Sequence, residues 1–255
     1  MNEALKILAI VCPLIFMAGF VDAVAGGGGV ISLPAYFLGG LPTHIAAGTN
    51  KLSAGCGTII AAIKYLRDGK VKMRIAVFSA IGAVCGSTIG TNLALFISEQ
   101  VLKGIMLVAI PLVAIFLVTQ KNIGKETVEK EIPVSRQSIL ATLIGLVIGC
   151  YDGLIGPGTG TFLILAFSTL LGLELVTSSG CAKVSNLASN ITSMIIYVLN
   201  GKVLFWLAIP AAICAMLGGY AGARFAIKGG AKNVRYVMFV VLRLLFGKTF
   251  LEVIL

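Results

Sequence analysis

The stretch G-F-V-D-A-V-A-G-G-G-G at residues 19–29 recurs in altered form as G-C-Y-D-G-L-I-G-P-G-T-G at residues 149–160. T-N-K-L-S at 49–53 follows the first copy and A-K-V-S-N at 182–186 follows the second. Asp22 therefore matches Asp152 at an offset of 130, and Lys51 matches Lys183 at an offset of 132. Because glycines, a carboxylate and an ammonium recur in apolar surroundings, the repeat predicts a transporter built from two halves.

The composition indicates an integral membrane protein. The chain of 255 residues is 58% hydrophobic and only 12% charged, and its mean hydropathy is +1.03. A soluble protein of this length could not bury so much apolar surface. Apolar runs that approach the roughly 20 residues of a membrane span recur at 5–21, 45–63, 75–97, 104–118, 139–150, 175–199, 203–223 and 234–251. We therefore expect an all-α, multi-pass protein of the cytoplasmic (cell) membrane, in contact with the lipid bilayer.

The basic residues indicate which loops face the cytoplasm. Most of the 20 lysines and arginines gather in connections at 64–74, 121–136 and 224–235, and such connections stay on the cytoplasmic side. The counterpart of the first connection, at 199–204, holds a single lysine. Equivalent loops therefore favour opposite sides of the membrane, which predicts two inverted-topology repeats of about four to five helical elements each.

This reasoning also predicts the domain organisation. Residues 1–120 form the first membrane repeat, 121–137 a cytoplasmic linker, and 138–255 the second membrane repeat.

The glycine clusters predict helices that break inside the membrane. Glycine costs about 1 kcal/mol and proline about 3 kcal/mol in a helix interior, so Gly26–Gly29 and Gly156–Gly160 favour discontinuous or re-entrant elements. Free N–H groups at the start of the following helix, together with its dipole, make an anion site. A nucleotide loop is rejected because neither cluster follows a strand or ends in GK[ST].

Two lysines lie well inside apolar stretches. A charged lysine at the bilayer centre costs about 2.5–3.5 kcal/mol, so such residues face a cavity or a partner. Lys51 and Lys183 either attract an anionic substrate or neutralise Asp22 and Asp152 as internal ion pairs, and the two interpretations are compatible. The aspartates themselves either carry a proton, as buried carboxylates can, or have a structural role.

Neutral polar residues surround the lysines. Lys183, Asn186 and Asn190 are spaced by three and four residues and share one helix face, where they line a substrate path or bond neighbouring helices. The predicted substrate-binding residues are Gly26, Gly27, Gly28, Gly29, Asn50, Lys51, Gly156, Gly158, Thr159, Gly160, Lys183, Asn186 and Asn190. Elsewhere, Gly82, Gly86 and Gly90, and likewise Gly218 and Gly222, have the four-residue spacing of close helix packing.

These motifs resemble those of the TauE/SafE family of membrane transporters. The resemblance rests on G-x-x-D-x-x-x-G-G-G-G-x-I-S-L-P from Gly19, Y-D-G-x-x-G-P-G-T-G-x-F-L from Tyr151 and A-K-x-x-N-x-x-S-N from Ala182. It covers residues 19–226 and implies a carrier, often an exporter, of small sulfur-containing anions such as sulfite or sulfonates.

Other classes of function are weaker. An anion channel needs only a lined pore, whereas paired broken helices are typical of alternating access. A membrane-embedded enzyme is disfavoured because no catalytic motif is visible and the chain has one histidine. We expect no catalytic residue, metal, cofactor or nucleic-acid partner. The anion, the direction of transport, the coupling ion and homo-oligomer formation are left open.

Overall fold

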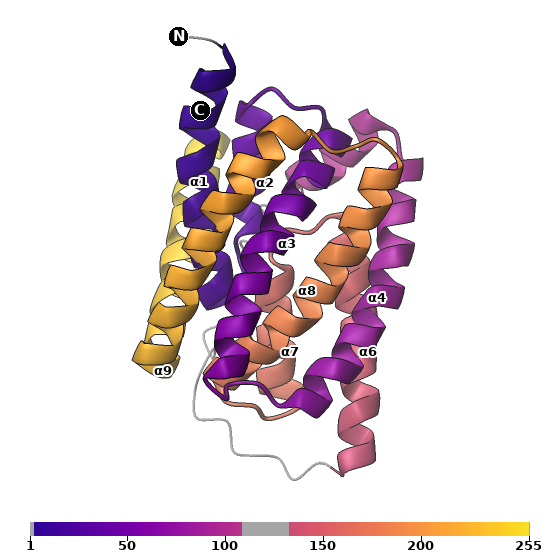
Figure 1. Cartoon of the computed structure of the whole chain (residues 1–255), viewed down its shortest axis with the longest axis vertical. Helices are drawn as coiled ribbons and strands as arrows, with labels where there is room; N and C mark the ends of the chain where they lie inside the picture. Colours follow the sequence, from indigo (N-terminus) through magenta and orange to yellow (C-terminus); the bar gives the residue numbers. More distant parts are fainter. Residues whose placement is uncertain (1–2, 109–132, 255) are drawn as a thin grey trace.

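The computed structural model describes residues 3–108 and 133–254, with side chains up to residue 237. Every regular element in these two segments is helical, as the sequence predicts (Figure 1). The labelled helices are α1 (Glu3–Ala25), α2 (Gly29–Leu38), α3 (Thr43–Arg67), α4 (Met73–Phe96), α6 (Val134–Leu154), α7 (Thr159–Leu170), α8 (Leu175–Leu199) and α9 (Phe205–Ile254). Residues 99–108 are helical as well.

Four of the described helices are long and apolar enough to cross a membrane. They are α1, α4, α6 and the first part of α9. Helices α3 and α8 have 25 residues each, but they carry the lysines and most of the buried polar side chains. They lie between the α1/α9 and α4/α6 pairs (Figure 1), so their polar faces are enclosed by protein.

Both predicted breaks are present. Helix α1 ends at Ala25 and α2 begins at Gly29, while α6 ends at Leu154 and α7 begins at Thr159. Glycine is required in both breaks, because Gly26 and Gly156 have φ angles of 79° and 92°. With 10 and 12 residues, α2 and α7 are too short to span a bilayer. Each leads back towards the end of the molecule where the helix before it began (Figure 1).

The outer helices pack in two close pairs through glycines, which confirms the packing prediction. A Cβ atom at Gly82, Gly86 or Gly90 of α4 would collide with carbonyl oxygens of α6. At Gly218 or Gly222 of α9 it would collide with carbonyl oxygens of α1. Backbones that approach this closely maximise van der Waals contact between helices in lipid.

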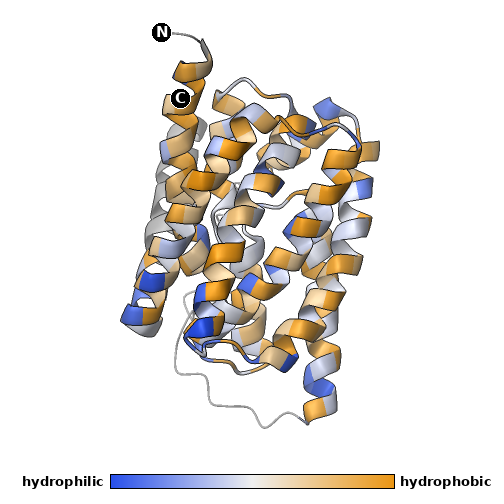
Figure 2. Ribbon diagram, in the orientation of Figure 1, coloured by the Kyte–Doolittle hydropathy of each residue, from blue (hydrophilic) through white to orange (hydrophobic). Residues whose placement is uncertain are grey.

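The contacts have the same pattern in both halves. In the repeat, α1 corresponds to α6, α3 to α8 and α4 to α9. The contact of α1 with α9 therefore corresponds to that of α6 with α4, and the contact of α3 with α9 to that of α8 with α4; all four contacts are present. In Figure 1, α1 and α3 start at the upper end, whereas α6 and α8 start at the lower end. Hydrophilic residues gather mainly at the lower end, where α3 leads to α4 and where α9 bends (Figure 2). The inverted orientation in a membrane and the cytoplasmic side of this basic end stay predictions.

Two predicted boundaries differ from the structure. The connection expected at 224–235 is helical, because α9 continues through it and only Gly230, at φ 60° and ψ −154°, leaves the helical conformation. Lysine and arginine are good helix formers, so the basic residues continue the helix. The bend is made by Gly230 alone. Helix α6 begins at Val134, so the end of the predicted linker is helical. The rest of the linker, and the predicted run at 104–118 beyond residue 108, lie outside the described residues.

Candidate functional site

The two breaks meet in the middle of the protein. The Thr161 N–H donates to the Gly26 carbonyl at 3.3 Å, and the Thr161 hydroxyl donates to the Ala25 carbonyl at 2.7 Å. A Cβ atom at Gly26 would overlap the backbone of Gly160, and one at Gly160 would overlap Gly26. The start of α7 is therefore seated directly on the end of α1, and neither glycine has room for a side chain.

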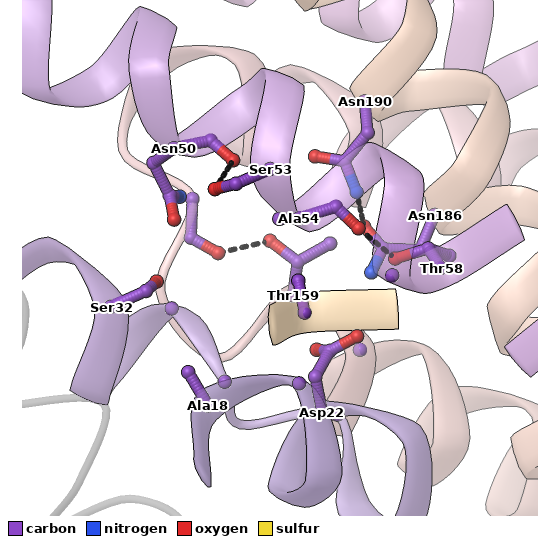
Figure 3. Close-up of a pocket in the computed structure, with 18 of the residues that line it drawn as sticks. Ala18, Asp22, Ser32, Asn50, Ser53, Ala54, Thr58, Thr159, Asn186 and Asn190 are labelled. Atoms are coloured by element: carbon purple, nitrogen blue, oxygen red, sulfur yellow. Dashed lines mark hydrogen bonds between the residues drawn. The ribbon is translucent and has the colours of Figure 1, made fainter. Parts of the chain in front are cut away.

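A cavity of about 40 Å³ opens beside this contact. A volume of this size holds a few water molecules or a small ion. Figure 3 shows Ser32 and Asn50 on one side of Thr159, with Asn186 and Asn190 on the other. The predicted residues that the structure brings to its wall are Asp22, Gly26, Gly28, Gly29, Asn50, Lys51, Asp152, Gly156, Thr159, Gly160, Asn186 and Asn190.

Three predicted residues do not line this central cavity: Gly27, Gly158 and Lys183. Lys183 is fully buried, with its ammonium against a carboxylate. Gly158 precedes α7 with a φ of 82°, which explains the glycine by backbone conformation.

Three polar residues of the wall were not among the predicted set: Ser32, Ser53 and Thr58. Thr58 stands at the position equivalent to Asn190, at the offset of 132 that relates the lysines, so the repeat held a signal for it. Ser32 has Phe162 at its equivalent position and belongs to an apolar helix, so no repeated pattern marked it.

The charged residues form two ion pairs, and each joins one half to the other. Lys51 Nζ lies 2.7 Å from Asp152 Oδ2 and also donates to the Asp152 carbonyl at 2.8 Å. Lys183 Nζ lies 2.7 Å from Asp22 Oδ2. Ser189 of α8 donates a further hydrogen bond to Asp152. In the structure, each lysine is thus paired with the aspartate of the opposite half.

This pairing changes the electrostatics expected of the site. Two ammonium and two carboxylate groups sum to zero charge, so the lysines supply no net positive charge to the cavity. Other donors are available. The N–H groups of Gly29 and Gly160, at the starts of α2 and α7, have no hydrogen-bond acceptor within the described residues. Both glycines line the cavity, where the positive ends of the two helix dipoles favour an anion.

The cavity wall also holds an unpaired amide. Asn50 is 8% exposed, and its Oδ1 atom has no hydrogen-bond partner in the described structure. A buried polar atom without a partner is destabilising by about 1–3 kcal/mol, and a bound solute or water removes that penalty. By contrast, Asn190 donates to Asn186 at 3.3 Å, so these two amides already bond one another.

Metal coordination has no visible basis here. Within the described residues, no group of three or more His, Cys, Asp or Glu side chains is placed to hold a metal ion.

Comparison with known proteins places these features in a family. The family model described as "Sulfite exporter TauE/SafE" matches residues 11–249. The chain is 33% identical over 238 residues to a probable membrane transporter protein, ORF9, of Sinorhizobium sp, covering 93% of this chain and 90% of that protein. It is 33% identical over 245 residues to a probable membrane transporter protein of Haemophilus influenzae (94% and 93% covered). It is 29% identical over 254 residues to the probable membrane transporter protein YfcA of Escherichia coli K12 (96% and 93% covered). No solved structure matches significantly.

Proposed function

Because the chain belongs to the TauE/SafE family of multi-pass membrane transporters, we propose that it is a secondary carrier for a small anion. The proposed cargo is a sulfur-containing anion such as sulfite or a small sulfonate, bound in the central cavity. The carrier would work by alternating access, in which the two halves rock about the point where α1 and α7 meet.

One observation supports an anion above all others. The cavity is bordered by the starts of two half-helices, and one N–H group from each, at Gly29 and Gly160, has no acceptor among residues 3–108 and 133–254. Backbone N–H groups at helix starts bind oxyanions without needing a net positive side chain. The hydroxyl of Ser32, on the same wall, adds a further donor.

The neutral sum of the ion pairs favours a small anion of low charge. An anion in this cavity is stabilised by partial charges, equivalent to about half an elementary charge at each helix start. Sulfite and sulfonates present three oxygens around one sulfur, which suits several N–H and O–H donors arranged about a small space.

A ligand panel tests the proposal. Purified protein in detergent is heated with sulfite, sulfate, thiosulfate, methanesulfonate or acetate, and the unfolding midpoint is measured. A bound anion at 100 times its Kd adds about 2.7 kcal/mol to the free energy of unfolding. Ser32→Ala should weaken this effect, whereas Ser87→Ala should not, because the Ser87 hydroxyl bonds within α4 to the Val84 carbonyl. Absence of stabilisation by every anion would refute the anion site.

Transport in proteoliposomes tests the carrier. Saturable flux with counterflow is expected, and unsaturated flux would indicate a channel instead. A proton-coupled role of the aspartates is tested by Asp22→Asn and Asp152→Asn under an imposed pH gradient. Accumulation that survives both substitutions would exclude them as proton carriers.

A further inference from the structure

A second, smaller cavity adjoins the first. It has a volume of about 10 Å³, and its own wall is apolar, with Leu33, Met106 and Tyr197 among the lining residues. Four residues line both cavities: Asn50, Lys51, Asp152 and Gly156. These four therefore form the partition between the two cavities, and the second cavity lies towards the end of the molecule where α8 ends and residues 99–108 lie.

The partition is closed by one ion pair. Lys51 reaches from α3 to both the carboxylate and the carbonyl of Asp152, at 2.7 and 2.8 Å. The break glycine Gly156 lies beside the ammonium, since a Cβ atom there would be 3.7 Å from Lys51 Nζ. Non-helical backbone on one side of the pair can move without breaking a helix. The unpaired Oδ1 of Asn50 offers an acceptor beside it.

Both routes are closed by buried side chains: Leu33, Met106 and Tyr197, beside the second cavity, are each at most 2% exposed and belong to one hydrophobic cluster. Tyr65 is the counterpart of Tyr197 at the offset of 132, and Val24 is the counterpart of Leu154 at the offset of 130. Tyr65 and Val24 belong to one hydrophobic cluster, both with 0% exposure. The Tyr65 hydroxyl donates to the Ala23 carbonyl at 3.0 Å, which ties α3 to α1. Neither cavity is lined by Lys183 or Tyr65.

We propose that the Lys51–Asp152 pair is the gate through which solute passes between the central cavity and the end opposite the basic connections. The Asp22–Lys183 pair, backed by the Tyr65 cluster, is the closed gate of the other route. The structure is then one state of the cycle, in which the Lys51–Asp152 pair separates the central cavity from the second, enclosed cavity. This inference rests on the proposed function, since it assigns the entry path of the same site.

Thiol labelling tests the gate without any substrate. In a background that lacks the six native cysteines, Ala54→Cys places a thiol in the central cavity. A membrane-impermeant maleimide is added from one face of oriented proteoliposomes at a time. Lys51→Met with Asp152→Asn should raise the labelling rate from the face opposite the basic connections by about tenfold, because the rate follows the fraction of open molecules. The matched variant, Lys183→Met with Asp22→Asn, should leave the rate from that face unchanged.

Controls separate gating from misfolding. Each variant must elute as a single peak in detergent. If the double variant does not fold, Ser189→Ala takes its place. This substitution removes the hydroxyl that donates a hydrogen bond to Asp152 and keeps both charges of the ion pair. An unchanged rate, or an equal rise in both ion-pair variants, overturns the gate. Because labelling needs no ligand, this result is independent of the anion panel.

Discussion

Removing one charge from the Asp22–Lys183 pair should strongly destabilise the protein. The Lys183 side chain has 0% exposure and that of Asp22 has 19%, and their charged atoms lie 2.7 Å apart. In Lys183→Met the half-buried Asp22 carboxylate loses its cation, which costs up to about 3–5 kcal/mol. At roughly 2–4 °C per kcal/mol for a chain of this size, the unfolding midpoint should fall by about 6–20 °C.

The assay is a thermal unfolding curve in detergent, read as the loss of the monodisperse elution peak. Adding Asp22→Asn to Lys183→Met removes the orphaned charge, so the double variant should recover most of the loss. The exposed pair of Lys64 and Asp68 provides a control, with side chains 27% and 32% exposed at 2.6 Å. Lys64→Met should cost no more than about 1 kcal/mol.

The reasoning is refuted if Lys183→Met shifts the midpoint no further than Lys64→Met. It is equally refuted if the double variant is no more stable than the single one, since the loss would then come from packing and not from an unpaired charge.

Two glycine pairs give further predictions, each with an internal control. Gly26→Ala should abolish anion binding or folding, because its Cβ would overlap Gly160. Gly40 has a similar φ of 78° but lies in open space, so Gly40→Ala should cost only about 1–2 kcal/mol of backbone strain. Equal thermal unfolding midpoints for the two variants would contradict this prediction. Gly86→Ala should lower the unfolding midpoint, because its Cβ would collide with an α6 carbonyl. A Cβ atom at Gly104 meets nothing within 4 Å, so Gly104→Ala should raise the free energy of unfolding by about 0.5–1 kcal/mol. Midpoint shifts of the same sign in the two variants would contradict the packing argument.

Backbone features were the most predictable part of this protein. Glycine runs that no helix tolerates predicted the breaks at Gly26 and Gly156. A four-residue glycine spacing predicted close helix packing, and the structure supplies the partners, α4 and α6. Both signals act locally, through φ angles or through one helix face, so a single sequence carries them. The helix through Gly230 could not be predicted in this way, because a cluster of basic residues is typical of a cytoplasmic loop and is equally compatible with a helix.

Partner choice was less predictable. The sequence showed that Lys51 and Lys183 needed partners, but each could have bonded the aspartate of its own half. The cross-pairing arises from the way α3 and α8 pack side by side, which is a property of the assembled fold. Ser32 was missed for a related reason: its place on the cavity wall follows from the return of α2 beside α3, and no residue pattern encodes it.

The crossed ion pairs bear on how the protein is made. When the first half has entered the bilayer and the second has not, Asp22 and Lys51 both lack their final partners. Each such charge raises the insertion free energy by about 2.5–3.5 kcal/mol at the bilayer centre. In the finished fold their partners are Asp152 in α6 and Lys183 in α8. We therefore expect the helices synthesised later to stabilise those synthesised first, and a chain truncated before α8 to be degraded faster than the full chain.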